Sequence, residues 1–510
     1  MSISTGLSRR AFLAGTSALG LLAATGARAQ SAAAAGDIAI PPPIGDIPTN
    51  APLRWIDSGD QKALFWNSFF PKYTQERGVE TVYDGLPWSE LNTVLPLGIR
   101  NGTAQDVFIL PSGVAPAVAV RDGWVQPIDD LIPDMAAWKA NFPDGAFLEG
   151  LNVFDGKTYG VPFTSALVTG AHLLFNRAML QEAGYDPEAS PLTYDQFRDA
   201  ARKITEASGG RAYGFIVGGA QVGRWGEIVR TLGQMSGAPV GDVSIAAGVD
   251  LTNGEVAWGR DEFVEAVELL LAMRDDGSVF PGALSITAPQ ARAFMPQGAA
   301  GMILQGPWNV PTWERENPDF DFGVAPPPRK EGTDGHVIVG QLASAGNTMF
   351  LNAKAGNPMA AADVLHYLGT PEGQVAWGSV VGPSDPPLFP EAQKRAGMSD
   401  RATATLAMLR DVIRVGPNPF ARNPALAEVA KVYVEPTPNL SATVQGLYAG
   451  QLTDVRAALK SVADAQSAAL DRAFEEARAA GAEVSRDDLV FPNWDVARDY
   501  VAADYEALRR

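Results

Sequence analysis

Alternation between short apolar segments and longer amphipathic ones constrains the fold of this chain more than any other feature. Segments typical of strands and of helices take turns in the order LRWID (53–57), QKALFWNSFFPKYTQERG (61–78), VETVYD (79–84), WSELNTVLPLGIRNG (88–102), DVFIL (106–110). The first helical segment is interrupted near Pro71, and a further short helix is expected over 111–123. Strand–helix–strand units of this length predict an α/β fold with a parallel sheet covered on both faces.

Helical signals continue beyond this region. Thr193 and Gln196 form a capping box that opens a helix ending at Gly209. The segment 261–277 carries one apolar face, and 358–378 is typical of two helices joined by a turn. The last ~110 residues are mainly helical in pattern, and no internal repeat is present.

The N-terminus has the pattern of an export signal. SRRAFLAG, starting at Ser8, contains the adjacent Arg9 and Arg10 of the twin-arginine motif, and a short apolar run leads to ARA, which ends at Ala29. We expect cleavage after Ala29, and no cysteine is present there for a lipid anchor. Residues 30–52 are rich in Ala and Pro and are expected to form a flexible leader. The sequence therefore predicts a protein free in a periplasm-like compartment.

Composition excludes several classes of site. The 510 residues include 40 Lys+Arg, 58 Asp+Glu and no Cys, giving a net charge of −18. This acidic balance disfavours nucleic acid and anionic membranes, and the absence of Cys excludes disulfides, iron–sulfur clusters and thiolate zinc sites. The three histidines share no metal-ligand spacing. We expect no cofactor and no metal.

Motifs for catalysis fail on spacing. The GKT at 156–158 resembles the end of a P-loop, but Leu151 stands where the first glycine is required, and Gly160 and Pro162 oppose the helix that should follow. LASAG at 342–346 lacks the first glycine of a serine-hydrolase elbow. A pair of glycosidase carboxylates stays open among 58 acidic residues, although no particular pair stands out.

Tryptophans beside Gly or Pro indicate another kind of site. Trp88, Trp225 and Trp308 occupy such positions in GLPW, GRWGE and QGPWN. An indole can stack on the apolar face of a sugar ring while polar groups bind its hydroxyls. Packing in the core is the alternative for each single Trp.

Four segments, in order, resemble the family 1 extracellular solute-binding proteins of ABC importers, the group that includes maltose-binding protein. They are AQDVFIL…GWVQPIDDLI (104–132), DGKTYGVPF…LLFNRAML…YDQFRDAARKIT (155–205), AFMPQGAAGMILQGPWNV…FDFGVAPPP (293–328) and MAAADVLHYLGTPEGQVAW (359–377). The chain departs from the family at Leu110, where an aromatic residue is usual. The resemblance covers roughly 53–388.

This resemblance implies two α/β lobes of the type II periplasmic-binding fold, each with a doubly wound sheet, joined at a hinge. Crossings between the lobes are expected at 164–170, near 321–328 and at 383–390. Lobe one would comprise 53–165 and 325–385. Lobe two would comprise 166–324 and 386–510, with a C-terminal helical extension that has no counterpart beyond about 469.

Site residues follow from the resemblance and from position. Trp308 matches a family tryptophan that stacks on sugar, and Arg224 with Trp225 resembles a cleft segment. Asp60 and Ser112 follow strands, where ligands bind in such sheets. The last two expected site residues are Gln341, in a pocket segment, and Trp88.

The resemblance implies a binding protein without enzymatic activity. It would capture a carbohydrate, present it to membrane permease subunits and act as a monomer. Binding of a glycerol phosphodiester, a polyamine or a peptide is one alternative, and a secreted carbohydrate-active enzyme is another.

Overall fold

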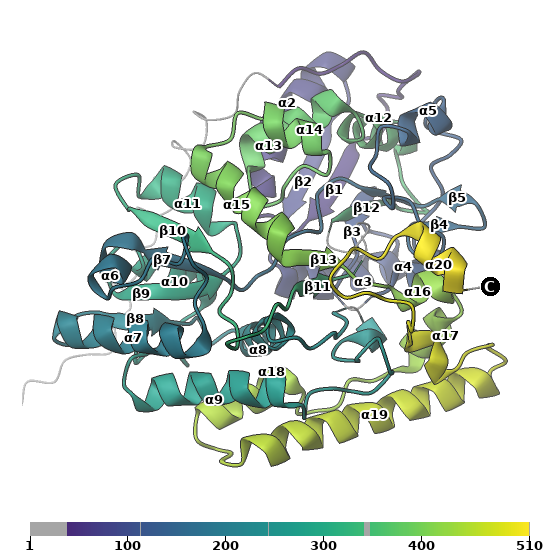
Figure 1. The fold of residues 1–510 in the computed structure, drawn as a ribbon. Helices are drawn as coiled ribbons and strands as arrows, with labels where there is room; N and C mark the ends of the chain where they lie inside the picture. Colours follow the sequence, from purple (N-terminus) through teal and green to yellow (C-terminus); the bar gives the residue numbers. More distant parts are fainter. Residues whose placement is uncertain (1–37, 113, 243, 341–346, 509–510) are drawn as a thin grey trace, which may run out of the picture.

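The structure is a computed structural model that describes residues 38–508 apart from 113, 243 and 341–346. Its core consists of two β-sheets in two separate lobes, each packed by helices (Figure 1). The α/β class and the two-lobed arrangement expected from the sequence are confirmed. Within the described residues, no helix combines the length and apolarity needed to cross a membrane.

Lobe one contains a five-stranded sheet in the order β2-β1-β3-β12-β6. β1 pairs in parallel with β2 and β3, whereas β12 is antiparallel to β3 and β6, so the sheet is mixed rather than wholly parallel. Its strands and the short β4–β5 hairpin are β1 (Leu53–Asp57), β2 (Thr81–Gly85), β3 (Val107–Ile109), β4 (Val153–Phe154), β5 (Lys157–Thr158), β6 (Gly160–Pro162) and β12 (Thr348–Leu351). Its helices are α2 (Lys62–Arg77), α3 (Trp88–Asn101), α4 (Pro116–Arg121), α5 (Met135–Lys139), α12 (Pro358–Leu368), α13 (Pro371–Val381) and α14 (Pro390–Arg395).

Lobe two contains a four-stranded sheet in the order β10-β7-β9-β8. Successive residues of β7 alternate between two apolar clusters, with Leu173 and Phe175 in one and Leu174 in the other, so both faces of the sheet are covered. Its strands are β7 (His172–Asn176), β8 (Tyr213–Ile216), β9 (Ala300–Gln305) and β10 (Phe322–Ala325). Its helices are α6 (Arg177–Glu182), α7 (Tyr194–Ser208), α8 (Gly223–Met235), α9 (Asp261–Asp275), α10 (Ala288–Phe294) and α11 (Asn309–Glu316).

Two helices of the N-terminal half show how local signals compete with packing. The capping box of α7 is present, because Gln196 N donates to Thr193 Oγ1 at 3.3 Å and Thr193 N donates to Gln196 Oε1 at 2.9 Å. The expected interruption of α2 at Pro71 is wrong, since the helix runs through it. Trp66 and Phe69, before the proline, and Tyr73, after it, are all buried in lobe one. Packing on both sides of Pro71 therefore outweighs its local effect.

The described part of the expected flexible leader, 38–52, is ordered against lobe one. Ile38 is buried, and Lys72 Nζ donates to its carbonyl oxygen at 3.3 Å. Asn357 Nδ2 donates to the carbonyl oxygens of Pro48 and Ala51, both at 2.9 Å. Hydrogen bonds to the leader's own backbone hold it in place, and no sequence pattern indicated them. The expected signal peptide lies outside the described residues.

Of the first two crossings between the lobes, the first lies where it was expected and the second does not. β6 belongs to lobe one and β7 to lobe two, so the chain crosses between Pro162 and His172, as expected. The expected crossing near 321–328 is wrong, because β10 still pairs with β7. The next strand, β11 (Val337–Val339), pairs with β13 (Ile413–Val415), and the chain rejoins lobe one only at β12. The start of this part of lobe one therefore moves from 325 to about 347.

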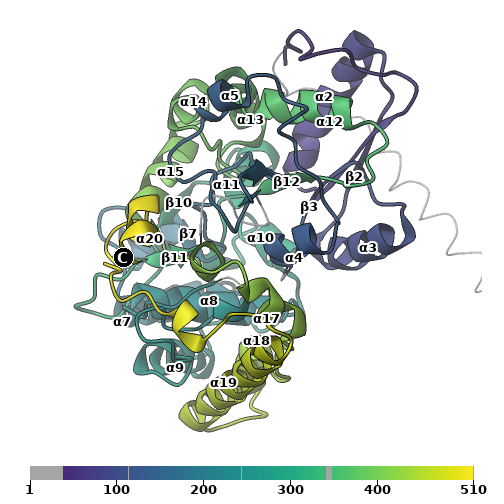
Figure 2. The same ribbon diagram turned by 90° about the vertical axis from the view of Figure 1, so that its right-hand side faces the viewer.

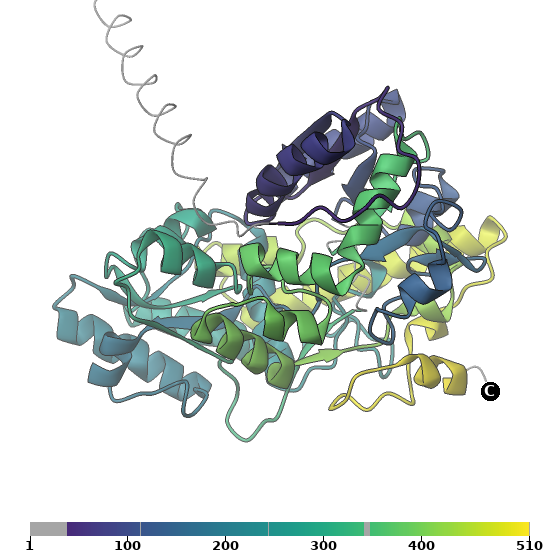
Figure 3. The same cartoon turned by 90° about the horizontal axis from the view of Figure 1, so that it is seen from above.

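The third crossing also lies later in the chain than expected. Leu388 and Ala392 pack in the core of lobe one, so α14 belongs to that lobe. α15 (Asp400–Val412) contacts α11 and β10, which belong to lobe two. In Figure 3 the green helices of this region lie between the purple and teal parts of the molecule. The crossing falls between Arg395 and Asp400 rather than at 383–390.

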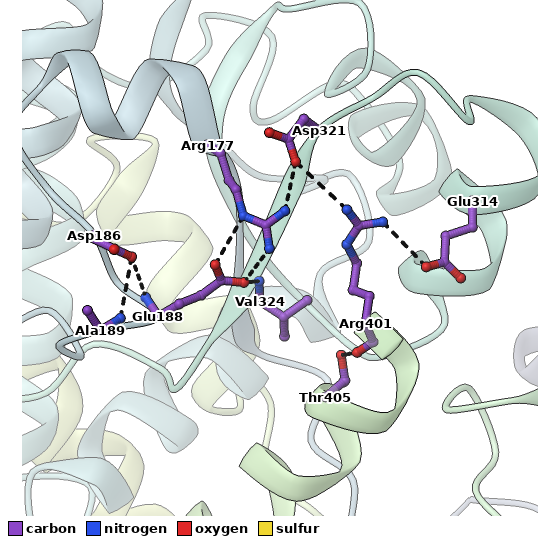
Figure 4. Close-up of polar contacts among 9 residues, drawn as sticks. All are labelled: Arg177, Asp186, Glu188, Ala189, Glu314, Asp321, Val324, Arg401 and Thr405. Atoms are coloured by element: carbon purple, nitrogen blue, oxygen red, sulfur yellow. Dashed lines mark hydrogen bonds and ion pairs between the residues drawn. The ribbon is translucent and has the colours of Figure 1, made fainter. Parts of the chain in front are cut away.

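Ion pairs fasten α15 to lobe two, as Figure 4 shows. Arg401 of α15 lies 3.3 Å from Glu314 Oε1 and 3.8 Å from Asp321 Oδ1. Asp321 in turn accepts from Arg177 at 2.7 Å, and Arg177 pairs with Glu188 at 2.7 Å. Three stretches far apart in the sequence, 177–188, 314–321 and the start of α15, are thereby joined, which makes α15 part of lobe two.

The C-terminal residues pack mainly on lobe two. Helix α19 lies along the underside of the molecule in Figure 1, against α9, α17 and α18. The helices after β13 are α16 (Pro419–Arg422), α17 (Leu426–Val432), α18 (Leu440–Tyr448), α19 (Val455–Ala479) and α20 (Ala502–Leu508). The mainly helical C-terminus predicted from the sequence is confirmed.

His172 makes the stability of lobe two sensitive to pH. Its side chain at the start of β7 has no exposed surface, and burial lowers its pKa to about 4. In the unfolded chain the imidazole of His172 binds a proton near pH 6.5, whereas in the folded protein it stays neutral down to about pH 4. The free energy of unfolding is therefore unaffected above pH 6.5 and decreases as the pH falls from 6.5 towards 4. Between pH 7 and pH 5 we expect the wild type to lose about 2 kcal/mol more stability than a His172→Leu variant.

Urea unfolding of both proteins at the two pH values measures this difference. All other titrating groups are the same in the two proteins, so their contributions cancel in the difference. Equal losses of stability in the wild type and in His172→Leu would contradict the buried, neutral state of His172.

Candidate functional site

The turn after β1 and the start of α11 bring the two lobes into contact. Gln61 Nε2 of lobe one donates to Thr312 Oγ1 of lobe two at 2.9 Å, and Arg315 Nη1 donates to Gln61 Oε1 at 3.3 Å. Gln61 directly follows Asp60, and Thr312 lies one helical turn after Trp308. The structure thus brings the segments of these two predicted site residues together from opposite lobes.

Trp308 ends the turn that follows β9 and is half-buried. A Cβ atom at Gly306 would lie 2.1 Å from its ring, so the glycine allows the indole to lie against the backbone. The Arg224 guanidinium lies 5.7 Å from the ring centre, and Thr312 Oγ1 donates to the Trp308 carbonyl at 2.8 Å. The indole therefore lies between Gly306 and Arg224, while part of the residue stays accessible.

Arg224 and Trp225 are neighbours at the start of α8 but face different surroundings. Arg224 is half-buried, donates from Nη1 to the Gly170 carbonyl at 3.0 Å and pairs with Glu227 at 2.7 Å. This fixes α8 against the first crossing. Trp225 has no exposed surface and donates from Nε1 to the Gly219 carbonyl at 3.0 Å. Its expected contact with a ligand is therefore corrected: Trp225 packs in the core of lobe two.

Trp88 and Ser112 lie on neighbouring segments of lobe one. Trp88 is the first residue of α3, and 37% of its surface is exposed. Ser112 is exposed after β3, and its backbone N–H donates to Asn92 Oδ1 of α3 at 2.9 Å. Asn92 is four residues after Trp88, so both lie on one face of the helix. Gln341, the remaining predicted site residue, lies outside the described residues.

A buried polar network beneath the turn fixes Asp60 and Gln61. Asp57, at the end of β1, accepts from Gly59 N at 2.8 Å, from Trp66 Nε1 at 2.6 Å and from Tyr83 Oη at 2.7 Å. The turn itself is left-handed, with φ of +67° at Gly59 and +56° at Asp60. The network and the glycine together hold the Asp60 side chain outward, where it is exposed.

Lys62 supplies the positive charge of this network. It pairs with Asp385 at 2.5 Å and donates to Ser58 Oγ at 3.2 Å. Burial opposes its charge, yet Asp385 and Asp57 outweigh burial and raise the pKa of Lys62. Burial raises the pKa of Asp57, although Lys62 opposes that shift. The ammonium therefore stays protonated and stabilises two carboxylates close to the proposed site.

Sequence reasoning missed Gln61, Thr312, Arg315 and Glu227. One signal was available, because Trp308, Thr312 and Arg315 are spaced i, i+4, i+7 and share a face of α11. Their pairing with Gln61 spans 251 residues and carried no signal.

No metal centre accompanies these residues. Within the part of the chain that the structure describes, no three His, Asp or Glu side chains are placed to hold a metal ion. Two surface hollows, of about 410 and 430 Å³, lie beside α3 and between α7 and α9, and neither is lined by any of the predicted site residues. Of the predicted site residues, Arg224 lies against Trp308, and Gln61, which follows Asp60, contacts Thr312 across the lobes.

Comparison with known proteins identifies relatives of this chain by sequence. Residues 58–375 match the family described as bacterial extracellular solute-binding protein. A Brucella abortus protein named only as a binding protein is 28% identical over 49% of this chain and 55% of its own length, so the chain spans about half of this curated relative. An ABC transporter extracellular-binding protein of Pyrococcus horikoshii is 26% identical over 66% of this chain and 70% of its own length.

Solved structures share the fold. The GacH receptor of Streptomyces glaucescens, solved unliganded and with acarbose, is similar over 82% of this chain and 98% of its own, with a TM-score of 0.62 and 18% identity. A Thermotoga lettingae solute-binding protein bound to tagatose is similar over 82% and 99%, with a TM-score of 0.60 and 19% identity.

Proposed function

Because the chain belongs to the family of bacterial extracellular solute-binding proteins, we propose that it captures a carbohydrate between its lobes and delivers it to the permease of an ABC importer. The observation that carries this proposal is Trp308, a half-buried indole at the lobe contact with polar groups around it. A flat apolar ring surrounded by donors and acceptors fits a sugar or polyol, whose ring face is apolar and whose rim is hydroxylated.

The charges at the lobe contact favour a neutral solute. Arg224 is paired with Glu227, and Arg315 with Glu316 at 2.9 Å, so neither cation is left for a phosphate. Asp60 is the only acidic residue among the predicted site residues that the structure describes, whereas a polyamine would need several carboxylates. The hydroxyl groups of a carbohydrate can donate hydrogen bonds to the carboxylates of these pairs and accept hydrogen bonds from their guanidinium groups.

Export completes the proposal. The twin-arginine segment around Arg9 would direct the folded protein to the periplasm, with cleavage after Ala29, and N-terminal sequencing of the mature protein tests this step. Soluble capture there, without covalent chemistry, is the role that we assign to the chain.

The decisive experiment is native mass spectrometry of the purified protein, followed by thermal shifts with sugars, polyols, amines and phosphodiesters. We expect a bound neutral carbohydrate that is recovered unchanged. At a hundredfold excess over its Kd, a solute that binds only the folded protein stabilises it by about 2.7 kcal/mol. Turnover of the bound carbohydrate would instead favour an enzyme, and stabilisation by amines or phosphodiesters alone would refute the sugar.

A further inference from the structure

A second contact between the lobes is apolar and involves the C-terminal part of the chain. We call residues 416–432, which include α16 and α17, the C-terminal segment. Its side chains share one buried cluster with two residues of lobe one, Ala115 before α4 and Leu151 before β4. The buried members from the C-terminal segment are Phe420, Ala421, Leu426 and Val429. Leu151 and Phe420 are each only 2% exposed, so the lobes are packed closely here.

Polar contacts accompany this cluster. Arg121 of α4 pairs with Glu428 of α17 at 2.8 Å and donates to the Ala427 carbonyl at 3.4 Å. At Gly150, where φ is +84°, a Cβ atom would lie 2.3 Å from the Phe420 carbonyl oxygen, so the two backbones nearly touch. Side chains and backbone of both lobes therefore take part in this contact.

The C-terminal segment is anchored to the rest of the C-terminus. α17 packs on α19, which packs in turn on α9 of lobe two. Asn423 Nδ2 donates to the Glu483 carbonyl at 2.9 Å and to Asp488 Oδ2 at 3.0 Å, and Arg422 donates to the Val490 carbonyl. In Figure 2, α17 lies between α4 above and α19 below. The segment is thus attached to lobe two while it contacts lobe one.

The contact at Gln61 and the contact at the C-terminal segment differ in how readily they can separate. At Gln61 the lobes are joined by hydrogen bonds, and water can replace those when the lobes separate. At the C-terminal segment, separation would expose Leu151 and Phe420 to water, and nothing compensates for that. Of these two contacts, the one at the C-terminal segment is therefore the more costly to separate.

We propose that the C-terminal segment is a latch that holds the two lobes closed before any solute binds. The latch limits how far and how often the lobes part, whichever solute the site takes. The C-terminal helices α17 and α19, which lie beyond the region that resembles the family, would then have a function: α17 forms part of the latch, and α19 holds it in place.

Two latch variants of the full chain test this proposal, Leu151→Ala and Glu428→Lys. The first removes apolar contact across the lobes, and the second places a cation opposite Arg121. Leu180→Ala is the matched control, because Leu180 of α6 is fully buried in a cluster confined to lobe two and lies on a helix that does not carry the latch. All proteins are freed of solute by unfolding and refolding, and native mass spectrometry verifies this.

Hydrogen exchange and small-angle X-ray scattering are then compared without added solute. We expect exchange of the α4 amides to accelerate about tenfold or more in Leu151→Ala, and less in Glu428→Lys, with a larger radius of gyration in both. The control should lose thermal stability without changing either quantity. Unchanged α4 exchange and radius in both folded latch variants would overturn the proposal, as would an equal increase in the control.

Discussion

Replacing Lys62 with methionine should lower the free energy of unfolding by about 3–4 kcal/mol at pH 7, because a buried ion pair that loses one partner leaves an uncompensated charge. The side chains of Lys62 and Asp385 are 8% and 21% exposed, and Asp57 beside them is fully buried. Methionine is close in length to the methylene chain of lysine and carries no charge. Urea unfolding followed by circular dichroism measures the loss.

The pH dependence of the free energy of unfolding of Lys62→Met tests whether the uncompensated charge of the carboxylates causes the loss of stability. Burial already raises the pKa of Asp57, and without Lys62 that pKa should rise further. The folded variant would then bind more protons than the unfolded chain, so its stability falls as the pH rises. We therefore expect the deficit relative to the wild type to shrink as the pH is lowered towards 4.

An exposed ion pair provides the control. Lys460 and Asp464 lie on α19 with side chains 68% and 63% exposed. Lys460→Met should change stability by less than about 0.5 kcal/mol. A Lys62→Met loss as small as that of this control would show that the network does not support the turn before α2.

Replacing Trp308 with alanine should weaken binding of the solute identified by mass spectrometry by about 10- to 100-fold, the loss expected when a stacking indole is removed. Trp308→Phe should retain part of the affinity, because a smaller aromatic face remains. Isothermal titration calorimetry with that solute measures both variants. Unchanged affinity of Trp308→Ala would contradict the proposed stacking role.

A second substitution tests the position of the indole without removing it. Gly306→Ala places a methyl group within 2.1 Å of the ring and should displace it, with a loss of affinity in the same direction. Trp124→Ala serves as the control, because Trp124 is also half-buried but lines the outer hollow beside α3. Its affinity for the solute should equal that of the wild type.

Local patterns carried much of the fold. The order of strands and helices from Leu53 to Ile109 is determined by apolar periodicity, which acts within a few residues. The capping box at Thr193 was likewise predictable, because it depends on a short run of residues. The first crossing, before His172, was predictable only through the resemblance to the family. The second crossing was not, since β10 and β11 stay in lobe two through pairing with β7 and β13.

The proposed site likewise contains residues whose position the sequence indicated and residues whose position it did not. Trp308 could be named from its sequence context, because a Gly-Pro turn after a buried strand places a residue at the edge of a sheet. Trp225 has a similar context beside glycines, but it packs against Tyr448, 4.4 Å away between ring centres, in a helix more than 200 residues later. Nothing near Trp225 in the sequence encodes that neighbour.

The sequence by itself determined the α/β class and the absence of disulfides. These depend on composition and on periodicities shorter than about ten residues. Only the tertiary structure decided which side chains meet across the lobes: Gln61 with Thr312, and Leu151 with the C-terminal segment. Such contacts join residues hundreds of positions apart, and the packing of two whole lobes selects them.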